Sequence, residues 1–290
     1  MTFGRDGSSP ARVKGVGSDL RRDQSVRFES GDGDPIGRLH ILIVDDAGVN
    51  RQIGQRLLQR LGCQADVVGD GQEALSALAV VAYDVVLMDI NMPNVNGIEA
   101  TRQIRRLLPD GRQPVVVAVS GAISGEERER CLAAGIDDFL AKPLRLDALR
   151  QVLVRAHSGD RRRPMVRNRA RMEAPEDGIL DAEAFAELAA ACLDTTPGYL
   201  LNLVEKYRRD AGMLIEEITA AGAASDFPLV QQAAHTLKGI SSMFGALALP
   251  ALCDRLAVIR SGTYELPAMI AAVSAEHERL LVAVASQIPE

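Results

Sequence analysis

Side chains that can do chemistry follow the apolar runs in the first half of this 290-residue sequence. Asp45 and Asp46 come directly after LHILIV, and Asp89 follows VVLM. Ser120 follows VVVAV, and Lys142 stands near the end of the weaker run DFLAKP. Short apolar runs of this kind predict buried strands, and strand ends on one side of a parallel sheet meet in one crevice. We therefore expect three carboxylates, a hydroxyl and an amine in a single site.

This set of groups suits phosphoryl chemistry. Clustered carboxylates repel one another, and a hard divalent cation such as Mg²⁺ relieves that repulsion while keeping waters and phosphate oxygens in its shell. An aspartate can attack phosphorus to form an acyl phosphate, while Lys142 supplies charge and Ser120 a hydrogen bond. Any one of these aspartates alone would be explained as a helix cap or a turn residue. The complete set, in strand order and with Pro143 after the lysine, favours a site.

The elements that must position these residues alternate between strands and helices. Helical patterns separate the apolar runs, at residues 49–61, 71–78, 98–108, 126–134 and 144–156, and a weaker strand is expected near 65–68. Strands that are apolar on both faces and alternate with helices predict a parallel sheet covered on both sides. The expected fold is a doubly wound α/β domain with five parallel strands, flavodoxin-like, over residues 38–157.

A second chemical pattern lies in AAHTLKGISSMFG, residues 233–245. Helical spacing places His235, Lys238 and Gly239 on one face. Glycine inside a helix costs about 0.5–1 kcal/mol relative to alanine, so its presence here indicates a partner that approaches closely. An imidazole with a pKa near 6.5 is largely neutral at pH 7 and can act as a nucleophile, and the lysine can attract a phosphoryl group.

A lone histidine on a helix is ordinarily a surface or core residue, and we keep that interpretation for His40, His157 and His277. From residue 179 onward the strand signal disappears and apolar residues follow helical spacing up to a last helix at about 267–286. The pattern predicts a separate all-α domain over residues 179–290, a four-helix bundle with four or five helices in total.

Two polar segments flank the first domain. Residues 1–37 carry many glycines and charges without periodicity, which predicts a disordered tail. Residues 158–178 read as a flexible linker, with a reach of roughly 25 Å that would hold the two domains at millimolar effective concentration.

Several classes of protein are disfavoured. Residues 179–290 hold 7 basic and 14 acidic side chains, a poor match for nucleic acid. The four cysteines show no metal-binding spacing, and we expect reduced thiols. No apolar run is long enough for a membrane span or a signal peptide, so a cytoplasmic protein is expected. We expect no kinase activity, because no stretch outside the two domains could hold an ATP-binding domain.

Residues 38–157 resemble the receiver domain of two-component response regulators, through VDD (44–46), MDINMPNVNG (88–97), SG (120–121) and KP (142–143). The resemblance implies that Asp89 accepts the phosphoryl group. It implies Mg²⁺ held by Asp46, Asp89 and the Asn91 backbone carbonyl, with Asp45 alongside. It also implies switch positions at Ser120 and Phe139, where Phe139 replaces the commoner tyrosine, and slow autodephosphorylation.

The run HTLKGISSMFGA resembles histidine phosphotransfer (HPt) domains, which implies that His235 accepts and donates phosphoryl groups beside Lys238 and Gly239. The leading hypothesis is a phosphorelay protein that exchanges phosphate with a histidine kinase and with cognate receiver or HPt proteins. Contact between its own two domains is an additional expectation. The alternative is a binding module or phosphate sink that docks on a kinase or regulator without forwarding phosphate.

Overall fold

The computed structural model describes residues 35–92, 95–121, 124–159, 178–193, 198–260 and 265–288. Most of the predicted tail and of the predicted linker therefore lies outside the described residues. The tail prediction is wrong at its end, because Pro35–Arg38 form a 3-10 helix, η1, and Ile36 is 1% exposed. Its backbone oxygen accepts a hydrogen bond from the thiol of Cys63 at 3.4 Å, so the first domain begins before residue 38.

A five-stranded parallel sheet forms the centre of the N-terminal domain, as predicted. The strands are β1 (His40–Val44), β2 (Gln64–Val68), β3 (Val85–Asp89), β4 (Val115–Ser120) and β5 (Asp138–Ala141). Their order is β2-β1-β3-β4-β5, and all neighbours are parallel. Val44 pairs with Met88, so Asp45 and Asp89 follow at the same level on adjacent central strands.

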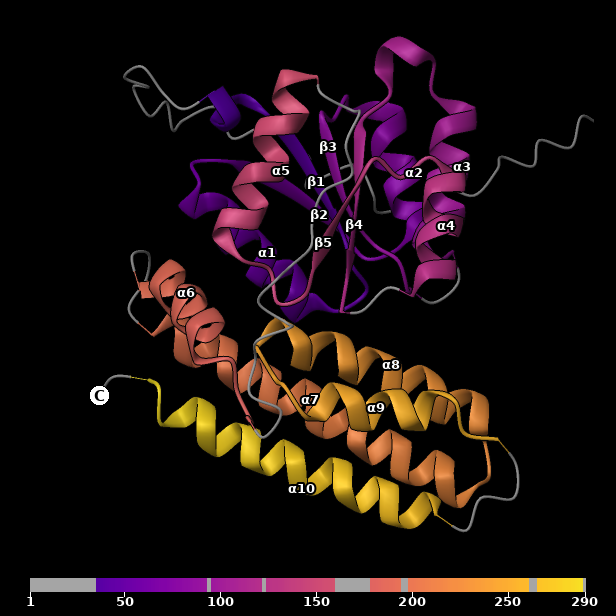
Figure 1. Cartoon of the computed structure of the whole chain (residues 1–290), viewed down its shortest axis with the longest axis vertical. Coiled ribbons are helices and arrows are strands. Elements are labelled where there is room, and N and C mark those ends of the chain that lie inside the picture. Colours follow the sequence, from indigo (N-terminus) through magenta and orange to yellow (C-terminus); the bar gives the residue numbers. More distant parts are fainter. Residues whose placement is uncertain are drawn as a thin grey trace, which may run out of the picture. The chain divides into compact units, whose positions relative to one another are not determined.

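Helices cover both faces of this sheet (Figure 1). They are α1 (Gly48–Arg60), α2 (Gly71–Val80), α3 (Gly97–Leu107), α4 (Gly125–Ala134) and α5 (Leu146–Ser158), with a short 3-10 helix η2 (Asp110–Arg112). Buried residues of α1 and α5 cluster with one set of strand side chains, and those of α2, α3 and α4 cluster with the alternate set. The sheet is thus buried on both sides, which the continuous apolar runs indicated.

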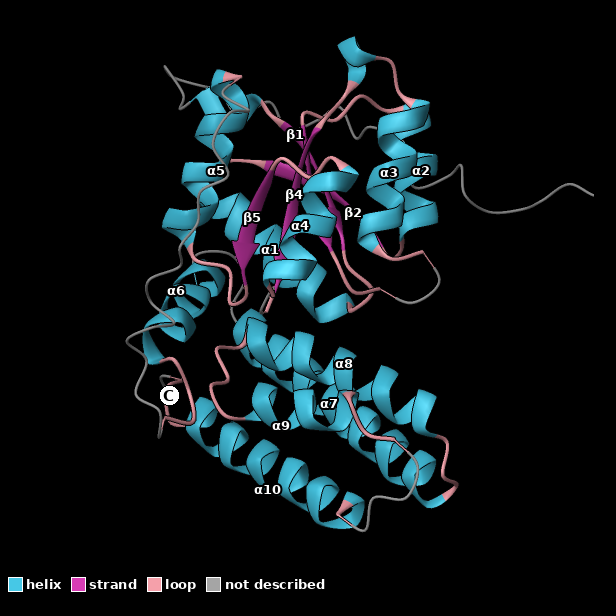
Figure 2. Ribbon diagram, turned by 45° about the vertical axis from the view of Figure 1, so that its right-hand side comes forward, coloured by secondary structure: helices cyan, strands magenta, loops and turns pink. Residues whose placement is uncertain are grey.

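The C-terminal half consists of helices among the described residues (Figure 2). They are α6 (Ala182–Leu193), α7 (Tyr199–Ala223), α8 (Phe227–Met243), α9 (Leu249–Ala257) and α10 (Leu266–Ala285). Helices α7 to α10 contact one another in sequence, and α10 closes the set against α7. This is the predicted four-helix bundle, with α6 as an additional helix.

Residues 34–290 form one compact unit. Helix α6 contacts α1 of the sheet domain as well as α7, and α8 also contacts α1. Within the described residues, none of the helices combines the length and the apolar character needed to cross a membrane.

Candidate functional site

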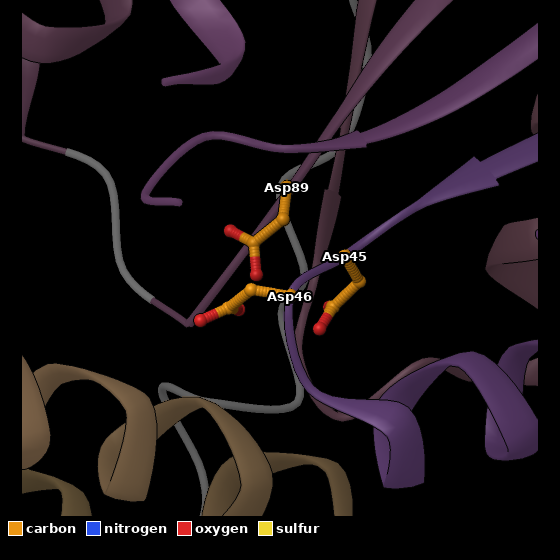
Figure 3. A group of neighbouring side chains, drawn as sticks. All are labelled: Asp45, Asp46 and Asp89. Carbon is orange, nitrogen blue, oxygen red and sulfur yellow. The ribbon is translucent and has the colours of Figure 1, made fainter. Parts of the chain in front are cut away.

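Three carboxylates gather where β1 and β3 end (Figure 3). Asp45 and Asp46 follow β1 directly, and Asp89 is the last residue of β3. Each offers an oxygen that lies within 4.8 Å of the others. Asp45 and Asp89 are 4% and 7% exposed, and Asp46 is half-buried. The convergence expected from the strand ends is therefore present.

Lys142 provides a positive charge inside this cluster. Its Nζ donates to Asp45 Oδ2 at 2.9 Å and to Asp89 Oδ2 at 2.6 Å. Burial alone would lower the pKa of the lysine, but the two carboxylates outweigh burial and raise it. Burial raises the pKa of Asp45 to about 6 although Lys142 opposes the shift, and burial together with Asp45 raises the pKa of Asp46. One lysine against three carboxylates leaves an excess of negative charge.

That excess, together with the oxygen ligands, suits a hard divalent cation. Carboxylate and carbonyl oxygens are the donors that Mg²⁺ prefers. Asn91, predicted to contribute its carbonyl, lines the same cavity as Asp46 and Asp89, and its backbone N–H donates to Asp89 Oδ1 at 3.1 Å. The residues present therefore fit the predicted metal.

His235 on α8 lines this same cavity. The lining residues come from both domains: Asp46, Asn50, Asp89, Asn91, Ser120, Gly121 and Lys142 from the first, and His235, Thr236, Lys238, Gly239 and Ser242 from the second. The structure thus brings together the two groups of residues that the two sequence patterns indicated, which lie about 150 positions apart in the chain.

The surroundings of His235 favour its neutral form. Burial lowers the pKa of the imidazole, and the cations of Lys238 and Lys142 lower it further. A neutral ring carries the lone pair that a nucleophile needs. Lys238 is held by Asp254, with its Nζ 2.5 Å from the Oδ1 atom, so this cation lies at the edge of the cavity with a fixed partner.

Gly239 faces the first domain closely. A β-carbon at this position would lie 3.7 Å from Asn50 Nδ2 and 3.8 Å from Lys142 Nζ, which is ordinary contact distance. Alanine therefore fits, whereas a longer side chain would enter space that the site occupies. The first domain does lie next to this helix, but the space there would admit a β-carbon, so the distances do not by themselves require glycine.

Four lining residues were absent from the predicted site residues, namely Asn50, Gly121, Thr236 and Ser242. Asn50 Nδ2 donates to Asp45, while its Oδ1 is buried without a partner among the described residues. The hydroxyl of Ser242 is also buried there and unpartnered. Thr236 Oγ1 lies 3.5 Å from Asp46 Oδ2. Helical spacing could have identified Ser242, because it stands two turns after His235.

Of the two predicted switch residues, both described in the structure, Ser120 lines the cavity and Phe139 does not. Ser120 ends β4, is 5% exposed and lines the cavity. Phe139 is buried in β5 with the guanidinium of Arg128 4.2 Å from its ring centre, and it is not among the described lining residues. Its ring therefore has a packing role in this structure.

Two family models match the chain. The response regulator receiver domain matches residues 41–154, and the Hpt domain matches residues 202–283. A solved structure, the receiver domain of sensor histidine kinase PA1611 from Pseudomonas aeruginosa, is 35% identical and covers 41% of this chain and 98% of its own, with a TM-score of 0.39.

Curated relatives align over both domains. The sensory/regulatory protein RpfC of Xanthomonas campestris pv. campestris is 30% identical over 208 residues, 71% of this chain and 28% of that protein. The sensor histidine kinase GacS of Pseudomonas protegens is 32% identical over 221 residues, 74% of this chain and 23% of that protein. The chain thus spans about a quarter of the length of these two proteins. It is a fusion of a response-regulator receiver domain with an Hpt domain.

Proposed function

We propose that this chain relays a phosphoryl group between Asp89 and His235. The observation that supports the proposal is the cavity, because the carboxylate, the imidazole and the cations of both domains line one space. Such an arrangement holds the reacting groups at positions that a bimolecular encounter would otherwise have to find. A binding module that never forwards phosphate has no need for this convergence.

In the transfer step, a nitrogen lone pair of neutral His235 attacks the phosphorus of the acyl phosphate on Asp89. The new P–N bond forms as the P–O bond to the carboxylate breaks, and the carboxylate of Asp89 is regenerated. Lys142, 2.6 Å from Asp89 Oδ2, neutralises the charge that returns to this oxygen. The Ser120 hydroxyl donates to a phosphoryl oxygen. The reverse reaction uses the same groups.

Asp46, Asp89 and the Asn91 carbonyl would hold Mg²⁺, with Asp45 behind them. The metal supplies positive charge to the phosphoryl oxygens when it is bound. The clustering of the carboxylates and the single lysine among them support this assignment. Water in the same site would hydrolyse the acyl phosphate slowly.

The phosphate would come from a histidine kinase and leave to a cognate receiver or HPt protein. GacS, one of the relatives, is a sensor histidine kinase. Transfer to and from other proteins requires the two domains to separate, since in the docked arrangement both nucleophiles line one cavity between the domains.

The test is to label the purified chain with radioactive acetyl phosphate and Mg²⁺. Base-labile acyl phosphate and base-stable phosphohistidine are then separated. Both forms are expected in the native chain, neither in Asp89→Asn, and only the base-labile form in His235→Gln. The matched control is His157→Gln, an exposed histidine on α5, which should behave as the native chain. Phosphohistidine that persists in His235→Gln would refute the assignment.

A further inference from the structure

The two domains meet over more than the cavity. Buried residues of α1 and α5 belong to the same hydrophobic cluster as buried residues of α6 and α7. Leu146 and Ala148, at the start of α5, are packed against this cluster. Helix α6 lies outside the residues that either family model matches. Its contacts with the receiver are therefore a feature of this chain beyond its two matched domains.

Arg145 joins the receiver to the segment around α6. Its guanidinium lies 3.5 Å from Asp181 Oδ1, 2.7 Å from Glu183 Oε2 and 3.3 Å from Glu187 Oε1. The arginine side chain is 13% exposed, so these ion pairs are partly shielded from water, although Glu183 is 79% exposed and contributes little. Burial would lower the pKa of Arg145, but the three carboxylates raise it.

Glu187 also accepts a hydrogen bond at the N-terminus of a receiver helix, α5. Helices α2, α3 and α4 are capped by their own preceding side chains, Asp70, Asn96 and Ser124. Helix α5 has no such side-chain cap. Instead the backbone N–H of Leu146 donates to Glu187 Oε2 at 3.1 Å, so a carboxylate from α6 sits at the N-terminus of α5, where a negative charge is favoured.

The contact made by Arg145 lies close, along the chain, to a residue of the receiver site. Arg145 stands three residues after Lys142, in the connection between β5 and α5. A second contact lies at the start of α7, where the guanidinium of Arg56 on α1 is 3.7 Å from the ring centre of Tyr199. Such cation–π contacts are attractive and suit arginine. The contact of Arg145 with the start of the α6 segment and the contact of Arg56 with the start of α7 together hold the bundle on the receiver.

We propose that the receiver of this same chain is the preferred partner of its own His235, selected by the contact of Arg145 with Asp181, Glu183 and Glu187. The inference rests on the proposed function and specifies its partner. The acidic start of the α6 segment matches a receiver that has an arginine directly before α5. A receiver with an acidic residue there would face three carboxylates and be repelled.

The experiment compares transfer within one chain with transfer between chains. In the first arm the native chain is labelled at Asp89 with acetyl phosphate, and phosphohistidine is followed at about 1 µM protein. In the second, labelled His235→Gln chain is mixed with Asp89→Asn chain at the same concentration. Because tethering gives effective concentrations on the order of millimolar, the native chain should transfer at least about tenfold faster, at a rate independent of concentration.

Charge reversal then tests the contact itself. Arg145→Glu should slow transfer within the chain about tenfold or more, and Glu187→Arg added to it should recover most of the rate. Arg112→Glu is the matched control, because this arginine is exposed and lies in η2 of the receiver. Labelling of Asp89 by acetyl phosphate should be unchanged in all of these variants, which verifies that the receiver is folded.

The outcomes separate the two proposals. Phosphohistidine in neither arm refutes the proposed function and this inference with it. Equal rates in both arms, or an Arg145→Glu chain that transfers as fast as the native chain, refutes only the preference for the chain's own receiver.

Discussion

Enlarging residue 239 is expected to separate the effect of close domain approach from the effect of helix stability. Gly239→Ala should leave transfer between Asp89 and His235 nearly unchanged, since its β-carbon meets Asn50 and Lys142 at 3.7 and 3.8 Å. The same change should stabilise α8 by about 0.5–1 kcal/mol, because glycine inside a helix is unfavourable by that amount.

Gly239→Leu should behave differently. One further carbon, about 1.5 Å beyond the β-carbon, leaves roughly 2.3 Å toward the Lys142 amine, where contact needs about 3.5 Å. The two domains must then move apart by roughly 1 Å. A displacement of that size at reacting groups costs about 100-fold in rate, so transfer within the chain should fall by about that factor.

The assay is single-turnover transfer of radioactive phosphate from Asp89 to His235 after removal of free donor. Gly212→Leu is the matched control, because a β-carbon at Gly212 in α7 meets no atom within 4 Å. The reasoning is refuted if Gly239→Leu, with native helix content, transfers at the native rate. It is equally refuted if Gly239→Ala, also folded, loses transfer.

Three further predictions concern single residues of the two domains. Lys142→Met leaves two buried carboxylates without their cation. The free energy of unfolding of the receiver, measured with urea in the presence of a chelator, should therefore fall by about 3 kcal/mol. A decrease below about 1 kcal/mol would contradict the pairing. Gly97→Ala would place a β-carbon 2.1 Å from the backbone oxygen of Asp89, so acetyl phosphate labelling should fall about 100-fold. Gly111→Ala, with no atom within 4 Å, should label normally. Burial lowers the pKa of His277, so the unfolded chain binds more protons and the bundle should lose stability as pH falls below about 6.5. Between pH 7.5 and pH 5.5, the free energy of chemical unfolding should decrease less in His277→Gln than in the native chain. An equal decrease in both chains would contradict this prediction.

The sheet and most of the receiver site could be predicted because their signals are local. Runs such as residues 85–88 are apolar on both faces, and the residue that ends each run is fixed by the chain. The weakest strand prediction was β2, which lies at the edge of the sheet with several exposed residues. An edge strand needs less apolar surface, so its pattern is less distinct.

The bundle could be predicted from helical spacing, with small errors where an apolar residue faces solvent. Leu201 is apolar but 57% exposed, while Leu203, two positions later in the same helix, is 2% exposed. Helical spacing identifies the apolar face of a helix approximately. Which of its residues become fully buried depends on how α7 packs against the neighbouring helices. The tail prediction failed at Ile36 because a single apolar side chain carries no periodic signal.

Contact between the two domains was an expectation from the sequence, but the residue pairs that make it could not be predicted. Arg145, Asp181 and Glu187 look like ordinary surface charges in the sequence, and their pairing depends on how two surfaces dock. The partner of Lys238, which is Asp254 on α9, is likewise determined by the packing of α8 against α9. Long-range charge pairs follow from tertiary structure and leave no periodic pattern along the chain.

The most direct test of the central claim follows one phosphoryl group through a single turnover. The chain is labelled briefly with acetyl phosphate and Mg²⁺, the donor is removed, and the modified residues are mapped at successive times by mass spectrometry under neutral conditions. The account predicts that phosphate leaves Asp89 as it appears on His235, with inorganic phosphate forming more slowly. Release of all the phosphate to water, with His235 unmodified throughout, would contradict it.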